Sequence, residues 1–182
     1  MAVVTREKIP QTRHAVCDVV PFGLLVDRES GPLVFLWTEE TEELPDRIIL
    51  DESERFLAFT SEKTFRDWVQ EHGDQYRVYK TAPDPMVVID WVDAMNDLAH
   101  IPENTDNLAS FICVLDDFHN SFKKCDAAQE QERDTLMRLF SHMFDHHGST
   151  RGFYRGGRGK RQVYEMAQNL TNRILLNTRI LA

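Results

Sequence analysis

Two prolines in the segment T-A-P-D-P, residues 81–85, divide the chain into two parts with different patterns. A residue that precedes proline is biased away from the helical conformation, so this segment is expected to interrupt regular structure. Before it, apolar runs of strand length alternate with turn clusters, and after it apolar residues recur at helical spacing. Strands that precede helices in this way indicate an α+β fold rather than an alternating parallel sheet. We expect an N-terminal, mainly antiparallel sheet with one helix, followed by a C-terminal bundle of about four helices.

The strand-rich part covers residues 13–82 of what we expect to be a single domain, residues 1–182. The turn cluster D-R-E-S-G-P at 27–32 lies before the apolar run L-V-F-L-W at 33–37 and predicts a hairpin. Pro21 suggests a break or bulge between the strands 14–20 and 23–26. Ser61 is a good N-cap for a helix that ends at Gly73. Further strands are expected at 47–50, 55–60 and 75–81.

The helical part, residues 86–182, is expected to hold helices over 86–100, from about 105 to 122, over 127–147 and over 161–181. In the first of these, carboxylates and apolar residues fall on opposite faces of a helical wheel. The acidic face holds Asp90, Asp93 and Asp97, and the apolar face holds Val88, Trp91, Val92, Met95, Leu98 and Ala99. In the third helix we expect an apolar stripe of Leu136, Leu139, Phe140, Met143 and Phe144, with Gly148 as the stop signal. The fourth is expected to bury Val163, Met166, Leu170, Ile174 and Leu181.

The net charge of −9 is unevenly distributed along the chain. Residues 1–82 carry −6, residues 83–147 carry −9 and residues 148–182 carry +6. An acidic middle segment disfavours nucleic acid as a ligand, because phosphate contacts need Lys and Arg, and it favours a basic partner. A solvated face that promotes solubility is the equally weighted alternative. A second acidic stretch, in a loop at residues 38–46, contains Glu39, Glu40, Glu42 and Glu43.

The three cysteines, Cys17, Cys113 and Cys125, are far apart in sequence and form no C-x-x-C pair. This pattern indicates reduced thiols rather than a disulfide framework or a zinc ribbon. The first twenty residues lack an apolar core, and no apolar run reaches the length of a membrane span. We therefore expect a cytoplasmic protein with no signal peptide, no membrane partner and no cofactor.

Three residues near the end of the third helix, in the segment H-M-F-D-H, have the spacing of helical metal ligands. His142, Asp145 and His146 lie at i, i+3 and i+4, as two imidazoles and a carboxylate do in some zinc sites. The interpretation we favour is that histidines in a last helical turn interact with the helix dipole and the last carbonyls. We expect no metal site there, and a metal-dependent hydrolase built on these residues is only an alternative.

The segment G-F-Y-R-G-G-R-G-K-R, residues 152–161, is basic and rich in glycine. It departs from the phosphate-binding loop because Tyr154 stands where the first Gly is required and Arg161 stands where Ser or Thr is required. An arginine-rich contact with RNA and a flexible connector are both compatible with its composition. The connector interpretation is favoured, with the arginines of 155–161 docking onto the protein's own acidic helices. That docking would compete with any partner for the face of Asp90, Asp93 and Asp97.

Signatures of known enzyme classes are missing from the sequence. It has no G-x-S-x-G, no Cys–His signature and no dinucleotide-binding fingerprint. The adjacent Asp116 and Asp117 would point about 100° apart on a helix, so the pair does not face one substrate atom. We therefore expect no catalytic residues and no enzymatic activity.

Two stretches resemble known bacterial families. F-L-A-F-T-S-E-K-T-F-R-D-W-V, residues 56–69, resembles the strand, Thr-Ser cap and helix of secretion-enhancer (SseB-like) domains. V-I-D-W-V-D-A-M-N-D-L-A, residues 88–99, and F-I-C-V-L-D-D-F-H-N-S-F, residues 111–122, are similar to the helical part of immunity proteins that accompany polymorphic or contact-dependent growth-inhibition toxins. This resemblance implies an intracellular protein that binds and blocks a cognate toxin.

From these patterns we expect an immunity protein whose acidic surface occupies the basic cleft of a nuclease-type toxin. The expected partner-binding residues are Asp90, Asp93 and Asp97, together with Glu39, Glu40, Glu42 and Glu43. An adaptor or secretion-associated chaperone, which would bind several partners through an apolar patch, is the alternative from another class.

Overall fold

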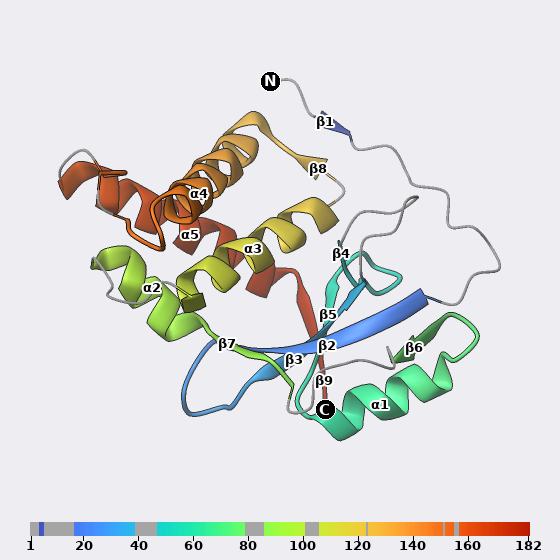
Figure 1. Ribbon diagram of the computed structural model, residues 1–182. Helices are drawn as coiled ribbons and strands as arrows, with labels where there is room; N and C mark the ends of the chain where they lie inside the picture. The colour runs from blue at the N-terminus through green and yellow to red at the C-terminus, as the bar shows by residue number, and fades with distance from the viewer. Residues whose placement is uncertain are drawn as a thin grey trace. The chain divides into compact units, whose positions relative to one another are not determined.

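The computed structural model describes residues 4–5, 17–38, 47–78, 86–100, 106–122, 124–150, 152–154 and 157–182 (Figure 1). The chain divides into two compact units. A sheet unit comprises Arg6–Ile89 and Asn177–Ala182, and a helical unit comprises Met1–Thr5 and Asp90–Leu176. The first holds a sheet with one helix and the second holds four helices, so the expected α+β fold class is confirmed.

The sheet unit is built on the strand order β6-β2-β3-β5-β9, with β4 paired to β3 and β7 paired to β2. Its antiparallel pairs are β2 with β3, β3 with β4 and β3 with β5, whereas β2 with β6 and β5 with β9 are parallel. The expected hairpin over 27–32 is the β2–β3 connection. The strands are β2 (Cys17–Leu25), β3 (Leu33–Thr38), β4 (Arg47–Ile48), β5 (Phe56–Phe59), β6 (Tyr76–Val78), β7 (Val88–Asp90) and β9 (Thr178–Leu181).

The break expected at Pro21 is wrong, because β2 runs through it without interruption. The backbone N–H groups of Cys17 and Gly23 donate to Gln75 and Val87, which lie in or beside the strands on the same edge of β2. Alternate residues of a strand point their N–H groups to the same edge, and Pro21 lies an even number of residues from Cys17 and from Gly23. The position of its missing N–H therefore faces that edge, between the pairing of Val19 with β6 and the hydrogen bond donated by Gly23. A proline is tolerated there because no strand among the described residues takes a hydrogen bond at this position of the edge.

Helix α1 (Glu62–Glu71) covers the core of the sheet unit. Ser61 caps it as expected, because the Ser61 hydroxyl accepts a hydrogen bond from the Thr64 N–H at 3.1 Å. Phe65 and Val69 are its buried residues. They join a core of apolar side chains from the strands: Val19, Val34, Leu36, Ile49, Leu57 and Phe59.

The chain returns to this sheet at its C-terminal end, where the expected helix over 161–181 is wrong in its last residues. Helix α5 (Gly157–Leu176) stops before β9, which pairs parallel to β5 from Phe56↔Thr178 to Phe59↔Leu181. Leu181 packs against the core of the sheet unit. Pairing with β5 therefore overrides the helical period that Leu181 continues in the sequence.

The helical unit consists of α2 (Trp91–Ala99), α3 (Asp106–Ser121), α4 (Ala127–Asp145) and α5. Both α3 and α5 contact each of the other three helices. A short antiparallel pair, β1 (Val4–Thr5) with β8 (Lys124–Cys125), adds to the unit. The apolar core is drawn from all four helices: Trp91, Ala94, Leu98, Leu108, Phe111, Ile112, Leu115, Phe118, Leu136, Leu139, Met143, Val163, Ala167, Leu170 and Ile174.

Three details of the expected helices are corrected by the structure. The helix expected over 86–100 begins at Trp91, since Val88 to Asp90 form strand β7, and Val88 is 47% exposed. Phe144 was expected in the apolar stripe of α4 but is 81% exposed. Ala99 was expected on the apolar face of α2 but is exposed.

Candidate functional site

The acidic face of α2 begins at Asp90, whose role is first structural. Its carboxylate accepts a hydrogen bond from the Asp93 N–H at 2.9 Å and caps the N-terminus of the helix. Asn107 of α3 clamps the Asp90 backbone, because its Oδ1 accepts from the Asp90 N–H at 3.1 Å and its Nδ2 donates to the Asp90 carbonyl at 2.9 Å. Asp90 therefore fixes where α2 starts and how it joins α3.

Asp93 and Asp97 lie one turn apart on the exposed side of the same helix. Asp93 is exposed and Asp97 is half-buried. Burial, and then the negative charge of Asp93, raise the pKa of Asp97 above its usual range, and His100 opposes the shift. The structure thus keeps two carboxylates close together where ionisation of one disfavours ionisation of the other.

The basic segment that was expected to compete for this face makes a different contact at its described end. Arg161 pairs with Glu165 of its own helix, with Nε 2.8 Å from Oε1, and this pair raises the pKa of Arg161. Lys160 places its Nζ 5.8 Å from the centroid of the Tyr154 ring. Arg155 and the side chain of Arg158 lie outside the described residues.

The second acidic stretch, Glu39, Glu40, Glu42 and Glu43, also lies outside the described residues. Its role in partner binding stays a prediction.

The residues of the H-M-F-D-H segment lie at the end of α4. The rings of His142 and His146 are 4.2 Å apart, and the backbone N–H of His146 donates to the His142 carbonyl at 3.1 Å. His147 follows with a positive φ of 52°, and the Gly148 N–H bonds back to the Met143 carbonyl at 2.7 Å. This is the hydrogen bond that closes a Schellman-type helix end.

A different group of potential metal ligands occurs inside the helical unit. His119 of α3, Cys125 of β8 and Glu130 of α4 bring a ring nitrogen, a thiol sulfur and a carboxylate oxygen within 4.8 Å of one another. Across the described parts of the chain it is the one such trio, so His142, Asp145 and His146 do not form another. His119 is fully buried, Cys125 is 3% exposed and the Glu130 side chain is 25% exposed.

Arg173 of α5 completes this buried cluster. Its Nη2 lies 3.1 Å from Nδ1 of His119, and its guanidinium carbon lies 4.6 Å from the centroid of the Phe122 ring. Burial lowers the pKa of Arg173, and the nearby Cys125 and Glu130 are among the groups that act in the opposite direction. Because arginine only donates, Nδ1 of His119 accepts, and the neutral ring carries its proton on Nε2, which faces Glu130.

Sequence reasoning missed this cluster because its members have no known motif spacing. The available signal was a histidine, a cysteine and a glutamate within twelve residues, around the junction of two expected helices. The fourth member, Arg173, comes from a distant helix and is brought in by packing alone.

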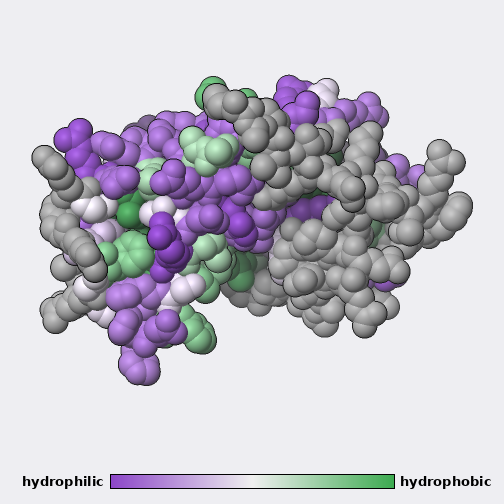
Figure 2. All heavy atoms as spheres, turned by 90° about the horizontal axis from the view of Figure 1, so that it is seen from above, coloured by the Kyte–Doolittle hydropathy of each residue, from purple (hydrophilic) through white to green (hydrophobic). Residues whose placement is uncertain are grey.

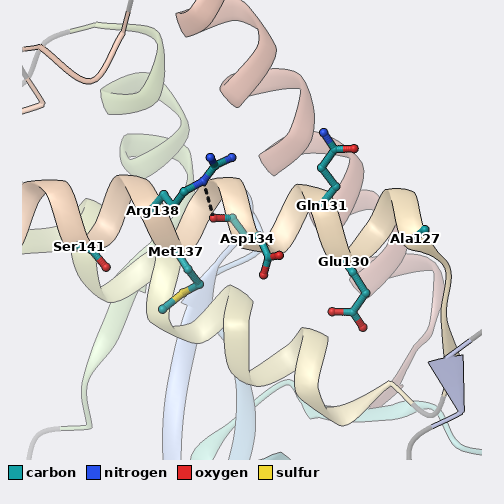
Figure 3. A pocket seen from close by; sticks show the side chains of 7 residues that line it. All are labelled: Ala127, Glu130, Gln131, Asp134, Met137, Arg138 and Ser141. Atoms are coloured by element: carbon teal, nitrogen blue, oxygen red, sulfur yellow. Dashed lines mark hydrogen bonds between the residues drawn. The ribbon is translucent and has the colours of Figure 1, made fainter.

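A shallow hollow lies along α4 and shares one residue, Glu130, with the buried cluster. Its lining is Ala127, Glu130, Gln131, Asp134, Met137, Arg138 and Ser141. Figure 3 shows Glu130 and Met137 on the side of α4 that faces the neighbouring helix, while Gln131 and Arg138 point the opposite way. Glu130 therefore belongs both to the wall of the hollow and to the cluster with His119.

None of the helices in the described residues has the length and hydropathy that crossing a membrane requires. No family model and no curated protein matches the chain. Among solved structures, the crystal structure of the SatS C-terminal domain in complex with bromine is similar, with a TM-score of 0.53 at 12% sequence identity. The similarity covers 90% of this chain and 94% of that one, and it concerns the fold alone.

Proposed function

We propose that the protein is a non-enzymatic immunity protein that binds a basic, nuclease-type bacterial toxin through the acidic face of α2. The observation that carries the proposal is the placement of Asp93 and Asp97 one turn apart on the same side of α2, where burial and the charge of Asp93 raise the pKa of Asp97. Burial of Asp97 and the neighbouring charge of Asp93 make ionisation of this pair less favourable than ionisation of two isolated carboxylates. A Lys or Arg of a partner placed between them would remove that penalty, so the face gains more from a cationic partner than from water.

The framework of α2 supports this assignment. The Asp90 cap, the clamp by Asn107 and the buried Trp91 hold the first turn of the helix in place. A rigid acidic surface meets a basic surface with little loss of side-chain and backbone entropy. The resemblance of residues 88–99 and 111–122 to immunity proteins falls on β7, α2 and α3, the elements that build this face.

The proposal is tested by capture and rescue. Immobilised wild-type protein and the D93N/D97N variant are exposed to lysate of the native cell, and basic proteins retained by the wild type alone are identified. Each is then expressed with and without the immunity protein, and growth is measured. We expect one captured protein to be toxic and co-expression of the wild type, but not of D93N/D97N, to restore growth.

Asp145 offers a control for the loss of surface charge, since it is exposed, lies in the same unit and loses one negative charge in D145N, where D93N/D97N loses two. D145N should capture and rescue as the wild type does. Rescue by D93N/D97N equal to that of the wild type would contradict the assignment to α2. Failure of every captured protein to inhibit growth would contradict the immunity function itself.

An adaptor that binds apolar partners is the second candidate, and exposed apolar side chains favour it. Phe144 is 81% exposed and Leu176 is 84% exposed. In the view of Figure 2, however, hydrophobic side chains of the described residues are interspersed with hydrophilic ones rather than gathered in one broad patch. Capture that is insensitive to salt and lost in F144S or L176S would favour the adaptor over the immunity protein.

A further inference from the structure

We propose that His119, Cys125 and Glu130 form a binding site for a single thiophilic divalent cation of the Zn²⁺ type. A thiolate, an imidazole and a carboxylate are ligands of zinc, and a sulfur ligand selects against Mg²⁺ and Ca²⁺. This site is separate from the acidic face of α2, so its existence does not depend on the proposed function.

The distances already approach those of a coordinated metal. With bonds of about 2.0 to 2.3 Å in a tetrahedral site, ligand atoms lie roughly 3.3 to 3.8 Å apart. Nε2 of His119 is 3.3 Å from Oε2 of Glu130, and the atom offered by Cys125 lies within 4.8 Å of the other two. Binding therefore requires side-chain movements of about 1 Å and no rearrangement of the fold.

The backbone around the three ligands is fixed by local hydrogen bonds. Asp126 caps α4, its side chain accepting from the N–H groups of Ala128 and Gln129, and its carbonyl accepts from the Glu130 N–H at 3.0 Å. Cys125 pairs with Val4 in the β1–β8 ladder. Cys125 and Glu130 thus lie on backbone that is hydrogen-bonded without any ion, and such preorganisation favours metal affinity.

Glu130 gives the site an opening. His119 and Cys125 are buried, whereas the Glu130 side chain is 25% exposed and lines the hollow along α4 (Figure 3). An ion can enter from the hollow, and water from the hollow can fill a fourth coordination position. Three protein ligands with one open position are also the usual composition of accessible zinc sites.

Arg173 limits the affinity of the site. Its guanidinium donates to Nδ1 of His119 and so places the proton on Nε2, the atom that a metal must take. It also supplies a positive charge close to Cys125 and Glu130. Binding a metal at Nε2 moves the ring proton to Nδ1, where it faces the Arg173 guanidinium and breaks the hydrogen bond between them, while the Cys125 thiol releases its proton. Replacing Arg173 by Met should therefore raise metal affinity by about tenfold. Loss of a residue that supports a metal ligand ordinarily lowers the affinity, so the direction of the change is diagnostic.

The site is tested by titrating tag-free full-length protein, first stripped with a chelator, with Co²⁺ and then with Zn²⁺. We expect one equivalent to bind, a thiolate-to-cobalt charge-transfer band to appear, and Zn²⁺ to displace it. The band should be lost in C125S and kept in C113S, because Cys113 is a half-buried thiol of the same unit that lies outside the cluster. Mass spectrometry under native conditions counts the bound ions.

Glu130→Gln keeps the test decisive if C125S folds poorly. Glu130 is partly exposed, so E130Q should keep the far-ultraviolet circular dichroism of the wild type and bind Zn²⁺ about tenfold more weakly. Absence of a charge-transfer band in the wild type would overturn the proposal. A band that persists in C125S or disappears in C113S would overturn it as well, as would weaker binding in R173M.

Discussion

Trp91, the first residue of α2, donates a hydrogen bond from its indole Nε1 to the hydroxyl of Thr171 on α5, at 3.1 Å. The Trp91 side chain is 3% exposed and its ring packs edge-on against Phe111, with centroids 5.3 Å apart. This bond therefore satisfies a buried donor and joins the helix with the acidic face to the C-terminal helix of the same unit.

Thr171→Val removes the acceptor of this bond while keeping the shape of the side chain. A buried indole N–H is then left without its partner, so the free energy of unfolding should fall by about 1 to 2 kcal/mol. Urea denaturation measures the change. T171S, which keeps the hydroxyl, should lose much less, and equal losses in the two variants would show that the hydrogen bond is not the cause.

The two functions of Asp90, capping and charge, can be separated by two substitutions. Asp90→Ala removes the cap and should lower the free energy of unfolding by about 1 kcal/mol. Asp90→Asn keeps a capping side chain and should lower it by only about 0.3 kcal/mol. Equilibrium denaturation of both variants checks this. Partner binding by D90N then reports the charge alone. A cost for D90N as large as that for D90A would contradict the capping role.

Asp97 should make the protein more stable as the solution becomes more acidic. Its pKa is raised in the folded protein above the value of 3.8, so the folded state binds the proton more tightly than the unfolded state does. The penalty is fully present above the folded pKa, declines as pH falls through it, and is gone below the unfolded value. Other carboxylates titrate in the same range, so the difference between wild type and variant isolates this contribution.

At neutral pH, Asp97→Asn should therefore raise the unfolding free energy by about 0.5 kcal/mol, the size of a like-charge pair one turn apart on a helix. This advantage over the wild type should shrink as the solution is acidified through the folded pKa. Denaturant titrations of both proteins across the acidic range measure it. An advantage that is constant with pH, or a destabilised D97N, would contradict the electrostatic cause.

Arg133 of α4 and Asp116 of α3 form an ion pair, and we expect removal of Arg133 to destabilise the protein more than removal of the Asp116 charge. Nε of Arg133 lies 2.5 Å from Oδ1 of Asp116, and Asp116 is the more buried, with a side chain that is 16% exposed. Removing Arg133 leaves a mostly buried carboxylate with Asn120 as a hydrogen-bond donor, whereas Arg133 without Asp116 keeps Asp134, 3.6 Å away.

Arg133→Met should accordingly cost about 2 kcal/mol of unfolding free energy, and Asp116→Asn about half as much. Thermal and urea denaturation of the two variants and of the double variant measure the pair by a double-mutant cycle. If D116N lowers the free energy of unfolding as much as R133M does, burial of Asp116 does not set the energy of the pair.

Local sequence patterns predict much of the fold. The Ser61 cap, the hairpin over 27–32 and the extent of α3 are all set by residues close in sequence, so the pattern of apolar and turn residues is sufficient. The local pattern gives the wrong structure where pairing with a segment distant in sequence determines the conformation. Strand β9 forms because β5 is available for pairing, and Pro21 is accommodated because it lies between two edge contacts of β2.

The same distinction applies to the candidate sites. The carboxylates of α2 share a face because helical geometry alone places Asp93 and Asp97 one turn apart. The cluster of His119, Cys125, Glu130 and Arg173 depends on the packing of α3, α4 and α5, and Arg173 is remote in sequence from the other three. Phe144 matches the apolar period of α4 but lies at its last turn and is exposed, since the period says nothing about where the packed neighbours end.

The most direct test of the central claim is the salt dependence of partner binding by the acidic face of α2. Once a toxic partner is captured, its affinity for wild type, D93N/D97N and D145N is measured by calorimetry over a range of ionic strength. The account predicts that the wild type and D145N lose affinity steeply with salt, and that D93N/D97N binds at least about tenfold more weakly at low salt with a shallower dependence. Equal affinity and equal salt dependence for all three proteins would contradict it.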